Sequence, residues 1–312
     1  MKHLITGAGG FLGSYLVQSV RALDPQADVV SLGLKAPAHS ALRHFECDLA
    51  DRQKIREFVS VEKPERIYHL AGSARVSQDV GMPEYYRSNF ETTRNLLDAL
   101  ESVAGPQRLF FASSVHVYGN QSGEVDEATE PAPNGFYGMS KYLGERLFET
   151  YCARRPGTSA VVGRLYTCIG PGQAPGFVTS DLAAQLSTLP ESGGVLKTGP
   201  LTARRRFLDV RDAADLIARL VQHPSATPFE VVNIASPFEM QVKEIVELLV
   251  KVSGKKVRIE SRSNAQNTFQ GLNLNRHKME KTLPGFKYRP LEKTVSDLWQ
   301  HHLKSNRSNH GE

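Results

Sequence analysis

The chain turns at residues 7–13 through Gly7-Ala8-Gly9-Gly10-Phe11-Leu12-Gly13, directly after the apolar run His3-Leu4-Ile5-Thr6. An apolar periodicity follows the turn and predicts a helix. Glycines allow a tight turn and a close approach to a pyrophosphate, whose charge meets the free N–H groups at the helix start. This strand–turn–helix context predicts a dinucleotide site, although a tight connection without a ligand is the alternative. The residues expected to contact the cofactor here are Gly7, Gly10, Phe11, Leu12 and Gly13.

Apolar, strand-like runs alternate with longer amphipathic stretches along the chain. The runs are Asp28–Leu32, Arg66–Leu70, Arg108–Ala112, Ser159–Leu165 and Glu230–Ile234. This alternation predicts an α/β fold, with a doubly wound parallel sheet covered by helices on both faces and a smaller C-terminal substrate lobe. We expect a nucleotide-binding domain over residues 1–165 and 207–235, a substrate lobe over 166–206 and 236–303, and a disordered polar tail over 304–312.

Composition disfavours several other classes of protein. The net charge is +5, but no arginine-rich tract is interleaved with aromatic residues, so we expect no nucleic-acid partner. Cys47, Cys152 and Cys168 lie far apart without metal-like spacing, and we expect reduced thiols and no bound metal. No apolar run approaches membrane-spanning length, and the glycine turn begins after only six residues. We therefore expect a cytoplasmic protein without a membrane partner.

The end of the second predicted strand bears on cofactor choice. A fold that selects NAD usually places Asp or Glu there, whereas this chain has Gly33. A missing acid and a nearby cation, Lys35 or Arg43, favour a 2′-phosphate and therefore NADP, with NAD as the alternative. Lys35 could also be an ordinary solvated loop lysine.

A tyrosine stands four residues before a lysine in Tyr137-Gly138-Met139-Ser140-Lys141. Positions i and i+4 share one helix face, so the ammonium can lie close to the phenol. A neighbouring cation lowers the pKa of a phenol and makes tyrosine a usable acid or base. Such pairs also arise by chance on solvated helices.

Three further segments resemble the extended short-chain dehydrogenase/reductases, a family that acts largely on nucleotide sugars. They are Glu46-Cys47-Asp48-Leu49, Tyr68-His69-Leu70-Ala71-Gly72 and Phe110-Phe111-Ala112-Ser113-Ser114-Val115-His116-Val117-Tyr118-Gly119. The resemblance spans nearly the whole chain. It implies a Rossmann fold, an NAD(P) cofactor and a nucleotide-diphosphate sugar as substrate.

The resemblance also implies roles for residues in the cofactor half. Asp48, with Leu49 beside it, would bond the adenine amino group, and Leu70, Ala71 and Gly72 would line the cofactor. Asn89 matches a family asparagine near the active site. Asp48 and Asn89 could instead be helix-start residues, a common position for both types. We expect His69 to be a locally satisfied strand residue.

In the family, a serine or threonine at the position of Ser114 hydrogen-bonds the substrate oxygen. Ser113 is the alternative, a neighbour pointing to the opposite face. The implied chemistry is hydride transfer at a carbinol carbon, in which Tyr137 passes the proton and Lys141 tunes it and binds the cofactor ribose. Dehydratases of the family carry an Asp-Glu pair where this chain has Val115 and His116. His116 could be a lone acid/base or a pocket-lining histidine.

The second half of the chain adds a more specific similarity. Gly170-Pro171-Gly172-Gln173, followed by Phe177-Val178, resembles family members that reduce a GDP-linked 4-keto-6-deoxyhexose. Arg205 matches an arginine that binds the diphosphate, although residues 204–206 could be a solvated basic turn. Most relatives have asparagine where this chain has Thr167. The expected substrate-binding residues are Ser114, His116, Thr167, Phe177, Val178, Lys197 and Arg205.

Together these patterns predict an NADPH-dependent nucleotide-sugar 4-ketoreductase of deoxysugar biosynthesis. An epimerase with a recycled cofactor and a non-catalytic NADP-sensing or scaffold protein are the alternatives, because fold does not fix function. We also expect a homodimer, because the helix that carries Tyr137 has a broad apolar face. That face comprises Leu143, Leu147, Phe148 and Tyr151.

Overall fold

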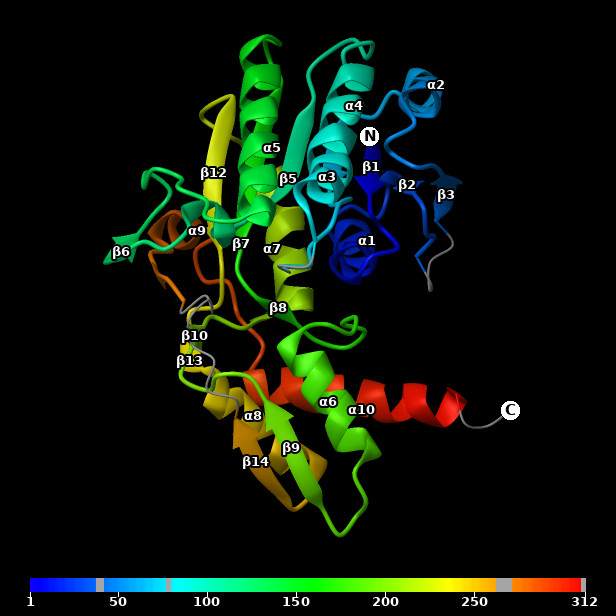
Figure 1. Cartoon of the computed structure of the whole chain (residues 1–312). Helices are drawn as coiled ribbons and strands as arrows, with labels where there is room; N and C mark the ends of the chain where they lie inside the picture. The colour runs from blue at the N-terminus through cyan, green and yellow to red at the C-terminus, as the bar shows by residue number, and fades with distance from the viewer. Residues whose placement is uncertain (38–41, 77–79, 262–270, 310–312) are drawn as a thin grey trace. The chain divides into compact units, whose positions relative to one another are not determined.

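The six predicted strands and one further strand, β3, join into a parallel sheet in the order β12-β7-β5-β4-β1-β2-β3 (Figure 1). The computed structural model describes residues 1–37, 42–76, 80–261 and 271–309. It divides into two units, and the sheet belongs to unit 1, which comprises Met1–Leu165, Ala213–Ile234 and Leu274–Phe286. Each neighbouring pair of strands is parallel. The predicted α/β fold with a parallel central sheet is therefore confirmed.

The strands of the sheet agree closely with the predicted runs. They are β1 (Lys2–Thr6), β2 (Asp28–Gly33), β3 (Arg43–Glu46), β4 (Arg66–His69), β5 (Arg108–Ser114), β7 (Ser159–Leu165) and β12 (Phe229–Ile234). The sequence does not predict β3. This strand lies at the sheet edge and is largely exposed, so its Arg-His-Phe-Glu sequence lacks the apolar run of a buried strand.

Helices cover both faces of the sheet. On one face, α2 (Arg52–Glu62), α4 (Thr92–Leu100) and α5 (Phe136–Ala153) pack with the strands in a single core cluster. On the other face, α1 (Phe11–Leu23) is bonded to α7 (Val210–Gln222) through Ser19 Oγ and Asp215 Oδ1, 2.6 Å apart. The remaining elements of unit 1 are α3 (Met82–Tyr85), the π-helix η1 (Tyr86–Glu91), the 3₁₀-helix η2 (Val115–Tyr118), β6 (Glu124–Val125) and α9 (His277–Thr282).

Unit 2 comprises Tyr166–Asp212, Ala235–Asn273 and Lys287–Glu312. Its core joins α6 (Val178–Thr188), α8 (Val242–Ser253) and α10 (Leu291–Asn309). Its strands form short pairs, namely β8 (Cys168–Ile169) with β11 (Leu208–Asp209), β9 (Gly194–Thr198) with β14 (Val257–Ser261), and β10 (Arg204–Arg205) with β13 (Met240–Gln241). One more short strand, β15 (Asn273–Leu274), pairs with β6.

The two units divide the chain differently from the expected domains. Residues 207–212 lie in unit 2 because β11 pairs with β8, and residues 274–286 lie in unit 1. The polar tail is helical rather than disordered as far as Asn309, because α10 continues beyond its buried anchor Trp299. Residues 310–312 lie outside the described part of the chain.

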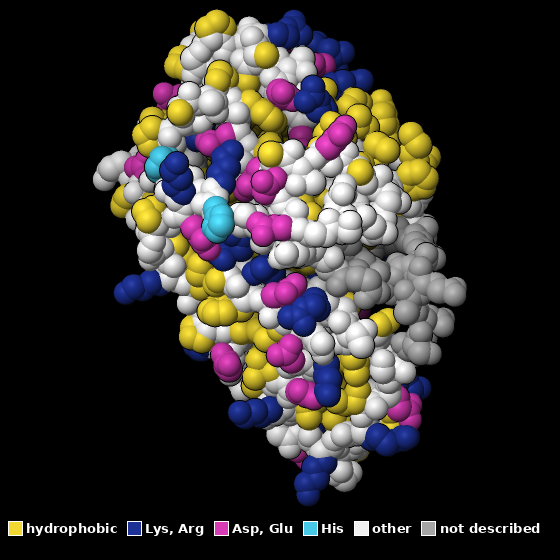
Figure 2. Space-filling model, turned by 90° about the vertical axis from the view of Figure 1, so that its left-hand side faces the viewer, with side chains coloured by type: hydrophobic (Ala, Val, Ile, Leu, Met, Phe, Trp, Pro, Cys, Tyr) yellow, Lys and Arg dark blue, Asp and Glu magenta, His cyan; other side chains and the backbone are white. Residues whose placement is uncertain are grey.

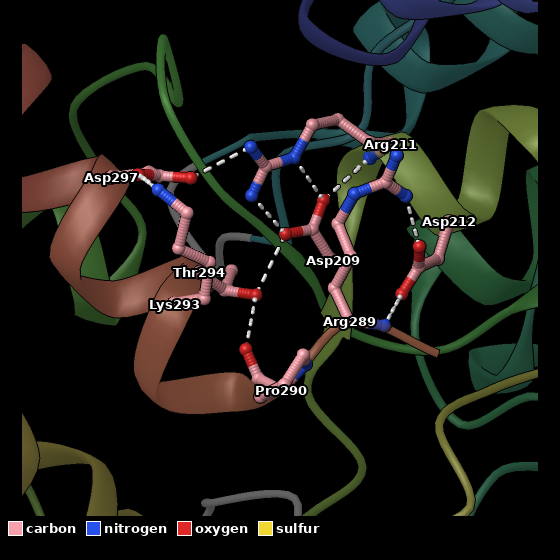
Figure 3. A network of polar contacts seen from close by, with 8 residues as sticks. All are labelled: Asp209, Arg211, Asp212, Arg289, Pro290, Lys293, Thr294 and Asp297. Atoms are coloured by element: carbon pink, nitrogen blue, oxygen red, sulfur yellow. Dashed lines mark hydrogen bonds and ion pairs between the residues drawn. The ribbon is translucent and has the colours of Figure 1, made fainter. Parts of the chain in front are cut away.

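A buried polar network organises the start of α7 within unit 2 (Figure 3). Asp209 accepts hydrogen bonds from the Arg211 backbone, the Arg211 guanidinium and Thr294 Oγ1. Burial opposes the charge of Asp209, but these donors hold its pKa below the ordinary value. Asp212 pairs with Arg289 beside it. The network therefore ties the first turn of α7 to α10 and to the segment that precedes it.

Charges of both signs are interspersed on the face shown in Figure 2. Within the described residues, no helix has the length and apolarity needed to cross a membrane.

Candidate functional site

The sheet reverses its winding between β1 and β4. From β1 the strand order runs to β2 and β3 on one side and to β4, β5, β7 and β12 on the other. In open α/β sheets, ligands bind beyond the carboxyl ends of the strands at such a switch point. The glycine turn follows β1 and residues 70–72 follow β4, so the two predicted cofactor segments both lie there.

The glycine turn is shaped by close backbone contacts. Gly7 has φ +72°, and a Cβ on Gly13 would lie only 2.2 Å from the Gly7 carbonyl oxygen. Gly10 is the N-cap of α1 and makes no side-chain capping bond. A helix start of this kind presents backbone N–H groups to an anion. The cradle therefore fits the pyrophosphate of a dinucleotide, the role predicted for Gly7, Gly10 and Gly13 and for Phe11 and Leu12 of the first helical turn.

A directed chain of hydrogen bonds fixes the segment after β4. Thr93 Oγ1 donates to the Asn89 carbonyl oxygen, so it accepts from His69 Nε2, 2.9 Å away. The other ring nitrogen then accepts from Thr6 Oγ1 at 2.7 Å, and Thr6 Oγ1 accepts from the Ala71 N–H at 3.3 Å. Burial, aided by the charge of Lys141, lowers the pKa of His69 to about 3. His69 is therefore a neutral, fully bonded strand residue, as expected.

Only one of the two candidate phosphate-binding cations lies at the glycine turn. A Cβ on Gly9 would meet the Lys35 carbonyl oxygen at 2.2 Å, so the Lys35 backbone packs against the turn. Arg43 instead begins β3 and bonds Asp28 at the amino end of β2, as well as Glu62. The prediction that Arg43 could bind the phosphate is wrong, because its partners hold it at the opposite end of the strands.

Asp48 is not the cap of the following helix. Asp51 is the N-cap of α2 and accepts from the Lys54 N–H. Asp48 Oδ1 accepts from the Ala50 N–H at 2.9 Å, and Asp48 Oδ2 pairs with Arg87 at 3.1 Å. The alternative of a simple N-cap is therefore excluded for Asp48. An adenine contact by Asp48, with Leu49 buried beside it, stays a prediction.

Asn89 joins the loop after β4 to the start of α5. It lies in the π-helix η1, a rare form that is frequent at functional sites. Its Oδ1 accepts from the Ser73 N–H at 2.7 Å, and its Nδ2 donates to Ser140 Oγ at 2.9 Å. A Cβ on Gly72 would lie 2.5 Å from Asn89 Oδ1, so glycine is needed for this approach. Asn89 is thus an internal connector rather than a helix-start residue.

The three predicted catalytic residues lie where β5, η2 and α5 meet. Lys141 Nζ donates to the Ala112 carbonyl oxygen of β5 at 3.0 Å. Ser114 Oγ accepts from the His116 N–H at 3.3 Å at the start of η2. The ring of His116 contacts the ring of Tyr137 edge to face, with centroids 5.6 Å apart. The structure therefore brings Ser114, Tyr137 and Lys141 into one region of unit 1, together with His116.

Burial destabilises the charged form of Lys141. Its side chain lies in the protein interior, and desolvation lowers its pKa from 10.5 to about 8. Between these two values the unfolded chain binds more protons than the folded chain, so folding stability rises with pH. The free-energy cost of burying the Lys141 ammonium lowers folding stability by its full amount below about pH 8.

Lys141→Met should therefore stabilise the protein near neutral pH. We expect a net gain of about 1–2 kcal/mol, from relief of a desolvation cost of up to about 3 kcal/mol and loss of the bond to Ala112. The gain should shrink as pH rises from 8 to 10.5. Chemical denaturation over this range measures it, with the exposed Lys54→Met of α2 as control. A Lys141→Met variant that is less stable than the wild type at neutral pH would contradict this expectation.

The other predicted substrate residues belong to unit 2. Phe177 is the N-cap of α6, Val178 is the first residue of that helix, and Lys197 is exposed on β9. Thr167 lies between β7 and β8, where its carbonyl oxygen accepts from the Leu208 N–H. Their contacts with a substrate stay predictions.

Arg205 is half-buried on β10, and burial lowers its pKa. Its neighbours have structural partners, because Arg206 donates to the Ser236 and Pro237 carbonyl oxygens and Arg204 pairs with Glu239. Residues 204 and 205 therefore form a strand rather than a basic turn, with Arg204 exposed to solvent.

Two features of the candidate site, Gly138 and Glu145, were not predicted from the sequence. A Cβ on Gly138 would lie 2.4 Å from the His116 carbonyl oxygen, so this glycine lets η2 approach α5. Glu145 extends the four-residue spacing of Tyr137 and Lys141 and is bonded to Ser113 and Arg164. The sequence signal for the first is a glycine between the predicted catalytic residues Tyr137 and Lys141, and the signal for the second is a carboxylate one turn beyond the lysine.

Comparison with known proteins identifies the family. Residues 3–235 match the model of the "NAD dependent epimerase/dehydratase family". The chain is 31% identical to a dTDP-6-deoxy-L-talose 4-dehydrogenase of Kitasatospora kifunensis over 80% of this chain and 78% of that protein. It is 28% identical to a GDP-6-deoxy-D-mannose reductase of Pseudomonas aeruginosa over 81% of this chain and 80% of the relative.

A solved structure confirms the fold. A UDP-glucuronic acid 4-epimerase from Bacillus cereus, in complex with UDP-glucuronic acid and NAD, superposes with a TM-score of 0.83 at 22% identity. The match covers 98% of this chain and 100% of that one. Since the family model matches most of the sequence, the chain belongs to the NAD dependent epimerase/dehydratase family of enzymes.

Proposed function

We propose that this enzyme uses NADPH to reduce the 4-keto group of a nucleotide-linked 4-keto-6-deoxyhexose, as a GDP-4-keto-6-deoxy-D-mannose reductase does. The observation that carries this proposal is the grouping of Ser114, Tyr137 and Lys141 beside Val115. The set contains a proton donor and a group to hold the substrate oxygen, but valine stands where a dehydratase needs an acid. The dehydrogenase and reductase relatives support the same assignment.

The roles of the chain's residues follow from their chemistry. NADPH, when held by the glycine turn and by residues 70–72, would supply the hydride. Ser114 Oγ would donate to the keto oxygen and orient it. Tyr137 would transfer its phenolic proton to the developing alkoxide, and the Lys141 ammonium would stabilise the phenolate that remains. The predicted contact of Arg205 would anchor the diphosphate in its bidentate fork.

An epimerase is the second candidate, favoured by the family description. An epimerase returns the hydride to the same sugar, so it consumes no added cofactor, whereas a ketoreductase oxidises one NADPH for each ketone reduced. Incubation with NADPH and a GDP-linked 4-keto-6-deoxyhexose tests the proposal. We expect steady NADPH consumption. Interconversion of UDP-sugars without NADPH loss would instead establish the epimerase.

The nucleotide can be tested separately by thermal shift. A ligand that binds only the folded protein raises its apparent stability by mass action. We expect GDP and GDP-sugars to raise the melting temperature more than UDP, dTDP or CDP and their sugars. A larger rise with dTDP would refute only the guanine assignment.

NADPH should be used in preference to NADH. Gly33 places no carboxylate near a 2′-phosphate, and Lys35 packs at the glycine turn. A charge-assisted phosphate contact contributes about 1.5–3 kcal/mol, so Lys35→Ala should lower kcat/KM for NADPH by roughly tenfold or more and leave NADH little changed. Arg43→Ala is the matched control and should keep the preference. A higher kcat/KM for NADH in the wild type would overturn this prediction.

A homodimer is also proposed, through a surface that shares only Leu143 with the expected one. Phe148 and Tyr151 are buried in the core and cannot form an interface. The exposed apolar side chains on α3, η1 and α5 form what we call the α5 surface, which comprises Met82, Tyr86, Phe136, Met139 and Leu143. On α5 they recur at helical spacing on one face.

Replacing Met139 and Leu143 with Glu should therefore give a monomer at micromolar concentration. Charges at the centre of an apolar interface cost several kcal/mol on association. Light scattering measures the mass, and Val61→Glu, exposed on α2, is the control. A wild-type monomer under the same conditions would rule out the dimer.

A further inference from the structure

The last three residues of β5 make three different contacts at the candidate site. The Ala112 carbonyl oxygen accepts from Lys141 Nζ at 3.0 Å, and Ser114 is the N-cap of η2. Between them, Ser113 Oγ donates to Glu145 Oε1 at 2.5 Å. The strand that presents Ser114 is therefore bonded to α5 at Lys141 and at Glu145, which lies four residues further along the helix.

The Glu145 carboxylate is completed from the next strand. Arg164 of β7, which lies in register with Ser113, donates from Nε to Oε1 at 3.1 Å and from Nη2 to Oε2 at 2.7 Å. Glu145 and Arg164 are both nearly inaccessible to solvent. Burial opposes the charge on Arg164, but the bonds with Glu145 raise its pKa. Both carboxylate oxygens of Glu145 are thus hydrogen-bonded inside unit 1.

Arg164 also contacts the segment after Ser114. Its guanidinium lies over the Tyr118 ring, 4.6 Å from the centroid, and Tyr118 Oη donates to Asn233 Oδ1 of β12 at 2.8 Å. One guanidinium therefore touches both α5, through Glu145, and η2, through Tyr118. These are the two elements that carry Tyr137 and His116.

We propose that Ser113, Glu145 and Arg164, the α5 clamp, are positioning residues that fix Tyr137 and Lys141 with respect to Ser114 during ketone reduction. The inference rests on the proposed function only for the identity of the reaction. Tyr137, Lys141 and Glu145 repeat every four residues, so the clamp holds the same face of α5 that presents Tyr137 and Lys141. Misplacement of about 1 Å can cost roughly 10²-fold in rate.

A buried ion pair can also serve only folding, and removing Glu145 or Arg164 would leave an unpaired buried charge. The informative variant is therefore Ser113→Ala, which keeps the ion pair and deletes the bond to β5. Its matched control is Tyr151→Phe. Tyr151 Oη donates to Gln107 Oε1 at 2.5 Å and ties the far end of α5 to the residue before β5. Each variant deletes one buried hydroxyl bond between α5 and the same strand segment.

We expect Ser113→Ala to lower kcat by roughly 10–100-fold, with KM for NADPH within about twofold of wild type. Tyr151→Phe should lose comparable thermal stability and keep its kcat, and Ser113→Thr should restore turnover. Equal kcat in the Ser113→Ala and Tyr151→Phe variants would overturn the clamp and leave a purely structural ion pair.

A second measurement requires no substrate. In protein carrying ¹³C-labelled lysine, the Lys141 signal, assigned by its loss in Lys141→Arg, should titrate near pH 8. A loosened α5 admits water, so the midpoint should rise in Ser113→Ala and stay unchanged in Tyr151→Phe. If the wild type reduces no keto sugar but this midpoint shifts, the proposed function fails and the clamp stands. An unchanged midpoint in Ser113→Ala would reject the clamp.

Discussion

Tyr137→Phe should lower turnover by roughly 10²–10⁴-fold and leave cofactor affinity nearly unchanged, because only the proton donor is removed. The ring contacts of Tyr137 with His116 and Tyr85 would be retained by phenylalanine, so the site should keep its shape. Steady-state kinetics with NADPH and the keto sugar measures turnover, and fluorescence titration measures cofactor binding.

Tyr142→Phe provides the control, since this residue follows Lys141 on the same helix and is not part of the proposed site. Near-wild-type turnover in Tyr137→Phe would require another acid. His116 is then the first suspect, because its ring lies 5.6 Å from that of Tyr137. The double variant Tyr137→Phe with His116→Gln would identify it.

The second large effect is an absence of dehydratase activity. We expect the enzyme to reduce a preformed GDP-4-keto-6-deoxyhexose and to form no ketone from GDP-mannose. Loss of water from the sugar needs an acid at the leaving oxygen and a base at the neighbouring carbon. Val115 is buried and has no group that can donate or accept a proton, so Val115 with His116 supplies at most one of the two groups.

Chromatography after incubation with each sugar tests this prediction. Boiled enzyme and Tyr137→Phe serve as controls for spontaneous conversion. Formation of the keto sugar from GDP-mannose by the purified wild type would overturn the assignment as a reductase.

The sheet was predictable because its strands are buried on both faces. Such strands appear as continuous apolar runs, and Ser159–Leu165 was predicted with the bounds that the structure has. The edge strand β3 is largely exposed, so its sequence contains no continuous apolar run. The glycine turn was predictable because the close backbone approach at Gly13 leaves no room for a side chain.

The hydrogen-bond and ion-pair partners of individual side chains were less predictable than the helices and strands. Asp48 and Asp51 are both acids before α2, and only the bond to the Lys54 N–H makes Asp51 the cap. Lys35 and Arg43 are both cations near Gly33 in sequence, yet strand register sends Arg43 to the other end of the sheet. The α5 clamp joins residues from three elements, so no local pattern reveals it.

The central claim is that net hydride transfer occurs from NADPH to the C4 carbon of a nucleotide-linked keto sugar. The direct measurement uses NADPH carrying deuterium at the transferable position of its nicotinamide ring, with the GDP-linked 4-keto-6-deoxyhexose. NMR and mass spectrometry of the product locate and count the label. The proposal predicts one deuterium at C4 for each NADPH oxidised, in wild type but not in Tyr137→Phe. Product formed without deuterium at C4, or sugar interconversion with NADPH unconsumed, would contradict it.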